Sequence, residues 1–209
     1  MMNMYIFGAS GFSREVADIC MEIGYDNITF IDNALKEETY FGYDVISEHE
    51  LSEMNFKDSH FAIGIGEPAI RKKIHEKFPD FMYPNIIHPS ASFGYDMKEN
   101  ICCSKGNIIT AGVRMTNNIK LGNFGIYNLN VTVGHDCITE NYITISPGAN
   151  VSGNIKLENE VYVGTGSTIL QGNSIDKKLI VGEGSTVGAG AVVVRDVIPN
   201  TVVKGIPAK

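Results

Sequence analysis

The chain has 209 residues, of which 44% are hydrophobic and 20% charged, and its formal net charge is -7 at pH 7. This length and composition predict a folded protein with a sizeable core, and an acidic balance without a basic cluster argues against a nucleic-acid-binding protein. No apolar stretch approaches the ~20 residues that cross a bilayer, and the first residues lack the features of a signal peptide, so we expect a cytoplasmic protein without a membrane span.

Residues 1–85 alternate between short apolar runs and amphipathic segments. Ser10 is a candidate N-cap, and Pro68 is suited to the first turn of a helix. The spacing predicts a parallel, Rossmann-like α/β domain over 1–85. In chain order, the predicted elements are a strand at 4–8, a helix at 10–24, a strand at 28–32, a helix starting at 47–54, a strand at 60–66 and a helix at 68–78.

The carboxyl ends of these strands form a candidate ligand crevice. The strands end in GASG (8–11), in Asp32 and Asn33, and in GIG (64–66). Ligands of parallel α/β units bind at this edge, with a phosphate at a helix N-terminus. GASG is an incomplete dinucleotide motif, so two alternatives stay open: the glycines simply make tight turns, and Asp32 simply caps the next turn.

Residues 86–209 carry a hexapeptide repeat. Every sixth residue from Cys103 to Val193 is apolar except Thr139, and the count runs through the bulky Tyr127 and through Ile175 without a slip. This pattern predicts an all-β, left-handed parallel β-helix of about five coils, with ~18 residues per coil. The aliphatic residues point inward, and glycines fit the corners.

The stretch VGHDC places an imidazole next to a carboxylate inside this repeat. His135 follows Gly134 near a corner, so its side chain is expected to point outward. The carboxylate of Asp136 raises the basicity of an adjacent imidazole and fixes its tautomer, as a general base requires. The alternative interpretation is a solvated loop histidine.

Several motifs occur in an order that is more specific than any one of them. They are GASGFSREVADI, FIDNA, AIGIGEPAIRKKI, IIHPSA, GHDC, ISPGANVSGNIKL, VGTGSTIL, VGAGAVV and GIPAK. In these motifs the chain resembles the left-handed β-helix acyltransferases, and within them the two-domain sugar N-acetyltransferases of bacterial glycan synthesis. The resemblance implies acetyl-CoA-dependent acetylation of the 4-amino group of a nucleotide-linked 4-amino-4,6-dideoxysugar for a surface glycan such as lipopolysaccharide O-antigen. Similar proteins O-acetylate sialic acid, which is the alternative function.

The resemblance also implies roles for individual residues. His135 would be the base and Asp136 its orienting neighbour, in a homotrimer with active sites at subunit interfaces and without a metal. Thr144 and Phe12 stand where relatives often have histidines, which puts the ligand geometry in doubt. The positions that match the nucleotide-sugar site are Ser10, Gly11, Phe12, Asp32, Asn33 and Gly66, and those that match the acetyl-CoA site are Thr144, Gly153, Thr165 and Ala189.

Two further classes of protein share features of this sequence. A β-helical zinc enzyme like the γ-class carbonic anhydrases needs three histidine ligands, whereas His135 is the only histidine after Pro89. A non-catalytic sugar-nucleotide-binding or scaffold protein would not need the His135–Asp136 pair. The nucleotide base and the sugar configuration stay open.

We expect all four cysteines to be small hydrophobic residues, without a disulfide framework: Cys20, Cys102, Cys103 and Cys137.

Overall fold

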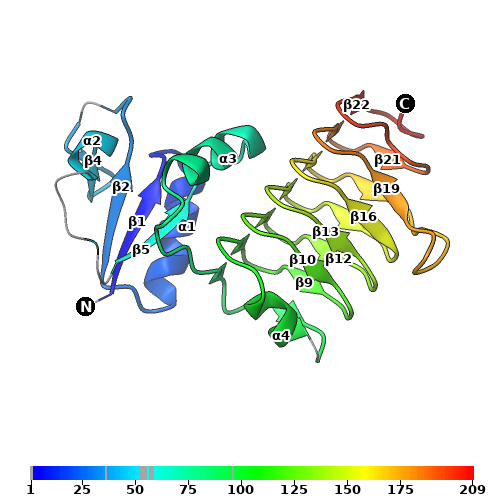
Figure 1. Cartoon of the computed structure of the whole chain (residues 1–209), viewed down its shortest axis with the longest axis horizontal. Helices are drawn as coiled ribbons and strands as arrows, with labels where there is room; N and C mark the ends of the chain where they lie inside the picture. The colour runs from blue at the N-terminus through cyan, green and yellow to red at the C-terminus, as the bar shows by residue number, and fades with distance from the viewer. Residues whose placement is uncertain (1, 36, 52–55, 57–58, 96) are drawn as a thin grey trace.

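The computed structural model describes residues 2–35, 37–51, 56, 59–95 and 97–209. It consists of an N-terminal α/β unit followed by a parallel β-helix (Figure 1), as the sequence predicted. Within the described residues, no helix is both long and apolar enough to cross a bilayer.

The α/β unit contains a five-stranded sheet in the order β3-β4-β2-β1-β5, in which only the β3–β4 pair is antiparallel. The predicted strands and helices are present, whereas the β3–β4 hairpin was not predicted. The predicted helix at 47–54 is described only as α2, because residues 52–54 lie outside the described part. The strands are β1 (Asn3–Phe7), β2 (Asn27–Ile31), β3 (Thr39–Tyr40), β4 (Tyr43–Ile46) and β5 (Ser59–Ile63), and the helices are α1 (Gly11–Glu22), α2 (Glu48–Leu51) and α3 (Pro68–Lys77).

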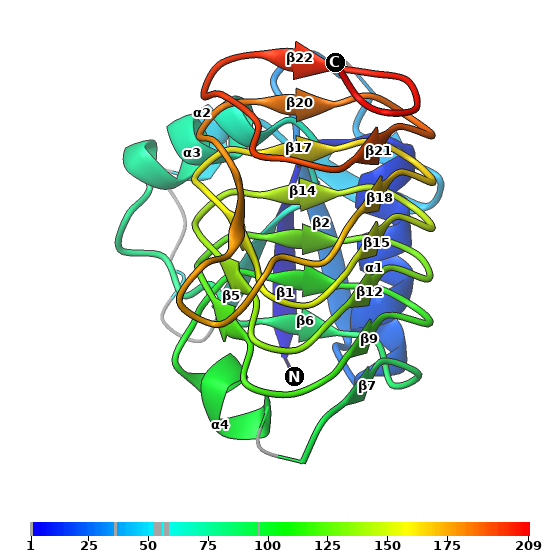
Figure 2. The ribbon, with the colours of Figure 1, turned by 90° about the vertical axis from the view of Figure 1, so that its right-hand side faces the viewer.

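The β-helix begins at β6 and stacks its strands into three parallel sheets (Figure 2). Parallel pairing between coils satisfies the backbone hydrogen bonds of these two- or three-residue strands. One sheet holds β6 (Ile86–Ile87), β8 (Ile108–Ile109), β11 (Ile126–Tyr127), β14 (Thr144–Ile145), β17 (Tyr162–Val163), β20 (Thr186–Val187) and β22 (Val202–Val203); the next holds β7 (Ser92–Phe93), β9 (Arg114–Met115), β12 (Thr132–Val133), β15 (Asn150–Val151), β18 (Thr168–Ile169) and β21 (Val192–Val193); the last holds β10 (Lys120–Leu121), β13 (Ile138–Thr139), β16 (Ile155–Leu157) and β19 (Leu179–Val181).

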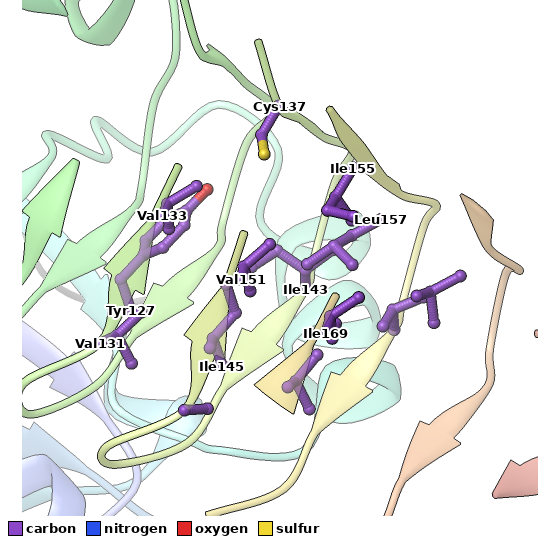
Figure 3. Packing of buried hydrophobic residues seen from close by; sticks show 14 of the residues in the cluster. Tyr127, Val131, Val133, Cys137, Ile143, Ile145, Val151, Ile155, Leu157 and Ile169 are labelled. Atoms are coloured by element: carbon purple, nitrogen blue, oxygen red, sulfur yellow. The ribbon is translucent and has the colours of Figure 1, made fainter. Parts of the chain in front are cut away.

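The repeat positions of these strands form the core of the β-helix (Figure 3). Val133, Ile145 and Val151 are buried, as the six-residue period predicts. Tyr127 and Thr139 are the two residues that fit the repeat least well, and both side chains point into the core. Their hydroxyls are buried and 2.6 Å apart. Each hydroxyl therefore has a partner in the otherwise apolar interior.

The count in sixes was wrong at two places. Ile145 pairs with Val163, 18 residues further along the chain, whereas Val163 pairs with Val187, 24 residues further. The additional six residues form a loop between β18 and β19, in which Ile175 is 57% exposed and not an inward repeat position. Because the insertion has the length of one hexad, the sequence count stays in phase across it.

The second error lies at the start of the repeat. Cys103 is exposed and directly follows α4 (Met97–Cys102), a helix that the sequence analysis did not predict. Met97 and Ile101 of this helix belong to the core cluster of the β-helix, so α4 covers the first coils (Figure 1). Cys102 is exposed as well, and only Cys20 and Cys137 are buried as expected.

The two parts of the chain are packed against each other through α1 and α3. The inner face of α1 lies on the sheet and shares a cluster with Ile86, Ile108 and Ile126 of the β-helix. From α3, the buried Arg71 donates five hydrogen bonds, all to main-chain carbonyl oxygens. Its acceptors are Phe124, Tyr142 and Ile143 in the β-helix and Ile65 and Gly66 after β5.

Candidate active site

The candidate site begins at the corner that follows β12. Asp136 has a φ of 59°, in the left-handed region, and the equivalent corners of the adjacent coils hold Asn118 (φ 52°) and Asn154 (φ 59°). Asn and Asp tolerate this conformation better than other residues with a side chain. Asp136 therefore keeps the corner geometry of the stack and adds a negative charge to it.

This carboxylate is held between two partners. His135 Nδ1 lies 2.6 Å from one carboxylate oxygen of Asp136, and the amide of Asn118 donates to the other oxygen at 2.5 Å. The hydrogen bond with His135, and then that from Asn118, hold the pKa of the Asp136 carboxyl below its usual value. With the proton on Nδ1 directed at the carboxylate, the Nε2 lone pair of His135 is free to accept a proton.

Glycines of two adjacent coils make room for the imidazole. A Cβ atom at Gly153 would lie 2.6 Å from His135 Nε2, and a Cβ atom at Gly134 would lie 2.6 Å from the backbone nitrogen of Gly153. Gly153, predicted as an acetyl-CoA contact, therefore lies directly against the imidazole. No side chain fits at Gly153 without displacing the ring of His135.

The imidazole opens into a groove of about 1090 Å³. The side chain of His135 is 46% exposed, so a substrate can reach its Nε2 atom. None of the described residues before Ser92 lines this groove, although residues 1–85 were predicted to hold the other substrate. The lining residues are Ser92, Phe93, Gly94, Tyr95, Arg114, Met115, Thr116, Asn117, Asn118, His135 and Asp136.

The predicted crevice residues gather at the carboxyl edge of the five-stranded sheet. Ser10 is the N-cap of α1, which begins at Gly11, and its N–H donates to Ser13 Oγ at 3.4 Å. The first turn of a helix presents N–H groups without intrahelical acceptors, which suits an anion. Both carboxylate oxygens of Asp32 are already used: one accepts the N–H of Ala9 at 2.9 Å and the other that of Ala34 at 2.8 Å. Asp32 therefore caps the turn after β2, and its contact with a nucleotide sugar stays a prediction.

The other crevice residues are also engaged. The side-chain oxygen of Asn33 accepts the N–H of Glu48 at 2.9 Å, which joins β2 to the start of α2. Phe12 is partly buried against the cluster around α1. The Gly66 carbonyl accepts hydrogen bonds from Arg71 and from the hydroxyl of Thr144, at 2.9 and 2.8 Å.

The four predicted acetyl-CoA positions do not lie together. Thr144 is buried at the junction between the two parts of the chain, where its hydroxyl is bonded to Gly66. Thr165 and Ala189 are exposed on adjacent coils at the corner after β17 and β20. Gly153 follows β15 and is the only one of the four beside His135.

Three important residues were missed by sequence reasoning. Asn118 could have been found, because it precedes Asp136 by one coil of the repeat. Arg71 carries no sequence signal, since its acceptors lie far along the chain. Lys178, on the inserted loop, donates to the main-chain oxygen of Asp136 at 2.5 Å.

In the described part of the chain, no group of three or more His, Cys, Asp or Glu side chains is placed to hold a metal ion.

Comparisons with known proteins agree with this architecture. The PglD N-terminal domain family matches residues 3–78. GDP-perosamine N-acetyltransferase of Escherichia coli O157:H7 is 32% identical over 162 residues, which are 74% of this chain and 72% of that protein. The acetyltransferase domain of PglB from Neisseria gonorrhoeae FA1090, solved with acetyl coenzyme A, is 30% identical with a TM-score of 0.88, and the match covers 99% of this chain and 98% of that one.

A third match is a histidine-to-asparagine variant of perosamine N-acetyltransferase from Caulobacter crescentus, solved with CoA and GDP-perosamine. It is 25% identical with a TM-score of 0.85, and the match covers 99% of this chain and 95% of that one. Together, the fold and the matches define an acetyltransferase built on a hexapeptide-repeat β-helix. The chain belongs to the N-acetyltransferases of this class that act on nucleotide-linked amino sugars.

Proposed function

We propose that this protein transfers the acetyl group of acetyl-CoA to the 4-amino group of a nucleotide-linked 4-amino-4,6-dideoxysugar, with His135 as the general base. The observation that carries the proposal is the 2.6 Å contact of His135 Nδ1 with the Asp136 carboxylate, which leaves Nε2 free in an open groove. A base needs this arrangement: a fixed tautomer and an accessible lone pair.

The reaction follows from this placement. The uncharged amine attacks the thioester carbonyl, and Nε2 of His135 takes the proton that the amine loses, directly or through one water. The C–S bond breaks, and coenzyme A leaves as a thiolate that is then protonated. The Asp136 carboxylate stabilises the imidazolium that forms, and holding both substrates in one groove supplies proximity.

We assign the nucleotide sugar to residues 1–85 and acetyl-CoA to residues 86–209. The match of the PglD N-terminal domain family to 3–78 and the N-terminus of α1 at Gly11 support the first assignment. The groove at His135 has no lining residue from 1–85 among those described, so a second copy of the chain would have to supply the crevice. This favours an oligomer with active sites at its subunit interfaces, and we propose the homotrimer that the resemblance implies.

GDP-perosamine is the first nucleotide sugar to test, because it is named for two of the matched enzymes. An acetylated sugar of this kind would enter a bacterial surface glycan such as O-antigen. Acetyl-CoA is supported as donor by the complex of the matched PglB domain.

The test is a thiol-release assay with acetyl-CoA and a panel of GDP-, UDP- and dTDP-linked 4-amino sugars plus free sialic acid. We expect turnover with one nucleotide amine, and a fall in kcat of about 10²- to 10⁴-fold in His135→Ala at an unchanged melting temperature. His88→Ala is the matched control, since His88 lies outside the groove.

Two results would contradict the proposal. Turnover on sialic acid alone would make the protein an O-acetyltransferase. Wild-type kcat in His135→Ala would remove the general base from the mechanism.

A further inference from the structure

The inserted loop between β18 and β19 reaches back to the His135 corner. Between β17 and β20 the coil has 24 residues instead of 18, as the pairings of Ile145, Val163 and Val187 require. Lys178 lies at the end of this insertion, directly before β19. Its ammonium group donates to the main-chain oxygen of Asp136 at 2.5 Å, across 42 residues of sequence.

This hydrogen bond acts on the residue that orients the imidazole. Asp136 has a left-handed backbone, and its N–H donates to the carbonyl of Asn117 at 3.1 Å. With Lys178 on the carbonyl, both peptide groups of Asp136 are fixed, while its carboxylate is held by His135 and Asn118. The geometry of the carboxylate therefore depends on a contact from the inserted loop.

We propose that Lys178 is a positioning residue for the His135–Asp136 pair: the inserted loop carries its ammonium group to the Asp136 main chain, where it fixes the carboxylate and adds a positive charge beside it. This inference rests on the proposed role of His135. It assigns a function to a six-residue insertion that the β-helix does not need for its own pairing.

The charge of Lys178 also acts on Asp136, by stabilising its carboxylate. The hydrogen bonds from His135 and Asn118 have the larger effects on the pKa of Asp136, and the ammonium of Lys178 also helps to hold this pKa below its usual value. Among the described residues, the charged side chains that line the groove are Asp136 and Arg114, and Lys178 acts from outside the groove. Without the Lys178 charge, the Asp136 carboxylate is therefore stabilised less.

Closing the loop does not require the Lys178 side chain. The backbone of the loop forms its own turn, in which the N–H of Asn173 donates to Lys177 O at 3.1 Å and the N–H of Lys177 to Ser174 O at 3.2 Å. Lys177, the neighbouring residue, is exposed. It therefore offers a matched control with the same charge and the same loop.

The experiment compares Lys178→Met, Lys178→Arg and Lys177→Met with the wild-type protein. In Lys178→Met we expect kcat to fall about 3- to 10-fold with an unchanged KM for acetyl-CoA. The acid limb of kcat/KM should move to higher pH by roughly 0.2 to 0.5 units, because a nearby positive charge has been lost. Lys178→Arg should restore most of both values, and Lys177→Met should change neither.

A second measurement does not depend on turnover. At a fixed pH, the NMR signals of the His135 ring should shift in Lys178→Met and stay unchanged in Lys177→Met. If the wild-type protein acetylates no substrate, the proposed function fails, and these signals still decide whether Lys178 acts on the pair.

The proposal is overturned if the kinetics and the His135 ring signals of Lys178→Met match the wild type. It is also overturned if only the KM for acetyl-CoA rises, since Lys178 would then contact the donor and not position the base.

Discussion

The α/β unit and the β-helix are organised on opposite principles. In the regular coils of the β-helix, a residue has an equivalent 18 positions along the chain, so Asn118, Asp136 and Asn154 occupy the same corner of successive coils. In the α/β unit, each contact occurs once, as in the five hydrogen bonds of Arg71. In the β-helix, Asp136 therefore stands out as the charged residue among the corner asparagines, and it lies at the candidate site. The α/β unit has no repeat against which an unusual residue could be recognised.

The largest expected effect comes from breaking the joint between the two regions. Arg71→Met removes all five hydrogen bonds, and the carbonyls of Phe124, Tyr142 and Ile65 lose their Arg71 donor. The other two carbonyls keep a second donor: Gly66 from the hydroxyl of Thr144 and Ile143 from the N–H of Ile126. We expect the free energy of unfolding to fall by about 3 to 5 kcal/mol, because each unsatisfied buried group costs about 1 to 3 kcal/mol and some recover water. Urea denaturation measures this change, and a loss below about 1 kcal/mol would mean that the hydrogen bonds of Arg71 contribute little to the joint.

A methyl group at Gly153 tests whether the space beside His135 is needed for activity. Since the Cβ would lie 2.6 Å from His135 Nε2, Gly153→Ala should displace the imidazole and lower kcat about 10- to 100-fold. Gly188→Ala is the control in the same β-helix, where the nearest atom, Cβ of Lys204, is 3.1 Å away. Equal kcat values for the two variants would show that the ring can move aside without loss.

The buried hydroxyls of Tyr127 and Thr139 test whether polar groups in the apolar core of the β-helix depend on their mutual hydrogen bond. Tyr127→Phe and Thr139→Val each leave one buried hydroxyl unpaired and should each cost about 1 to 3 kcal/mol of unfolding free energy. The double variant should cost less than the sum, because no unpaired hydroxyl remains. Additive losses in thermal or urea unfolding would show that the two hydroxyls do not depend on each other.

The smallest effect concerns the thiols. Burial raises the pKa of Cys20 to about 12 and that of Cys137 to about 11, so neither holds much thiolate at pH 8. Iodoacetamide at that pH should label the exposed Cys102 and Cys103 in the folded protein, and all four cysteines in denaturant, as mass spectrometry would report. Rapid labelling of Cys137 would indicate that the corner beside His135 opens in solution.

Repetition explains which parts of the fold the sequence predicted. The inward positions follow from a single period, and α1 follows from its apolar face and its N-cap. The insertion was hidden because its length equals one hexad, so that Ile175 fell on an apolar position by number while lying 57% exposed in a loop. The helix α4 interrupts the first coil, where too few repeats exist to reveal a departure.

The site was predictable to the extent that it is local. His135 and Asp136 are adjacent in sequence, and Gly134 indicates a corner. The contact of Gly153 with the imidazole depends on how two coils stack, and Arg71 meets acceptors 53 to 72 residues away. Such contacts are fixed by tertiary packing, which a single sequence does not contain.

The joint at Arg71 and α1 has a consequence for how the protein unfolds. A β-helix cut away from residues 1–85 would expose Ile108 and Ile126 to water, together with the carbonyls that Arg71 now satisfies. Neither part then has a complete surface of its own. We therefore expect one cooperative unfolding transition for the whole chain, and a truncated β-helix that aggregates when it is expressed alone.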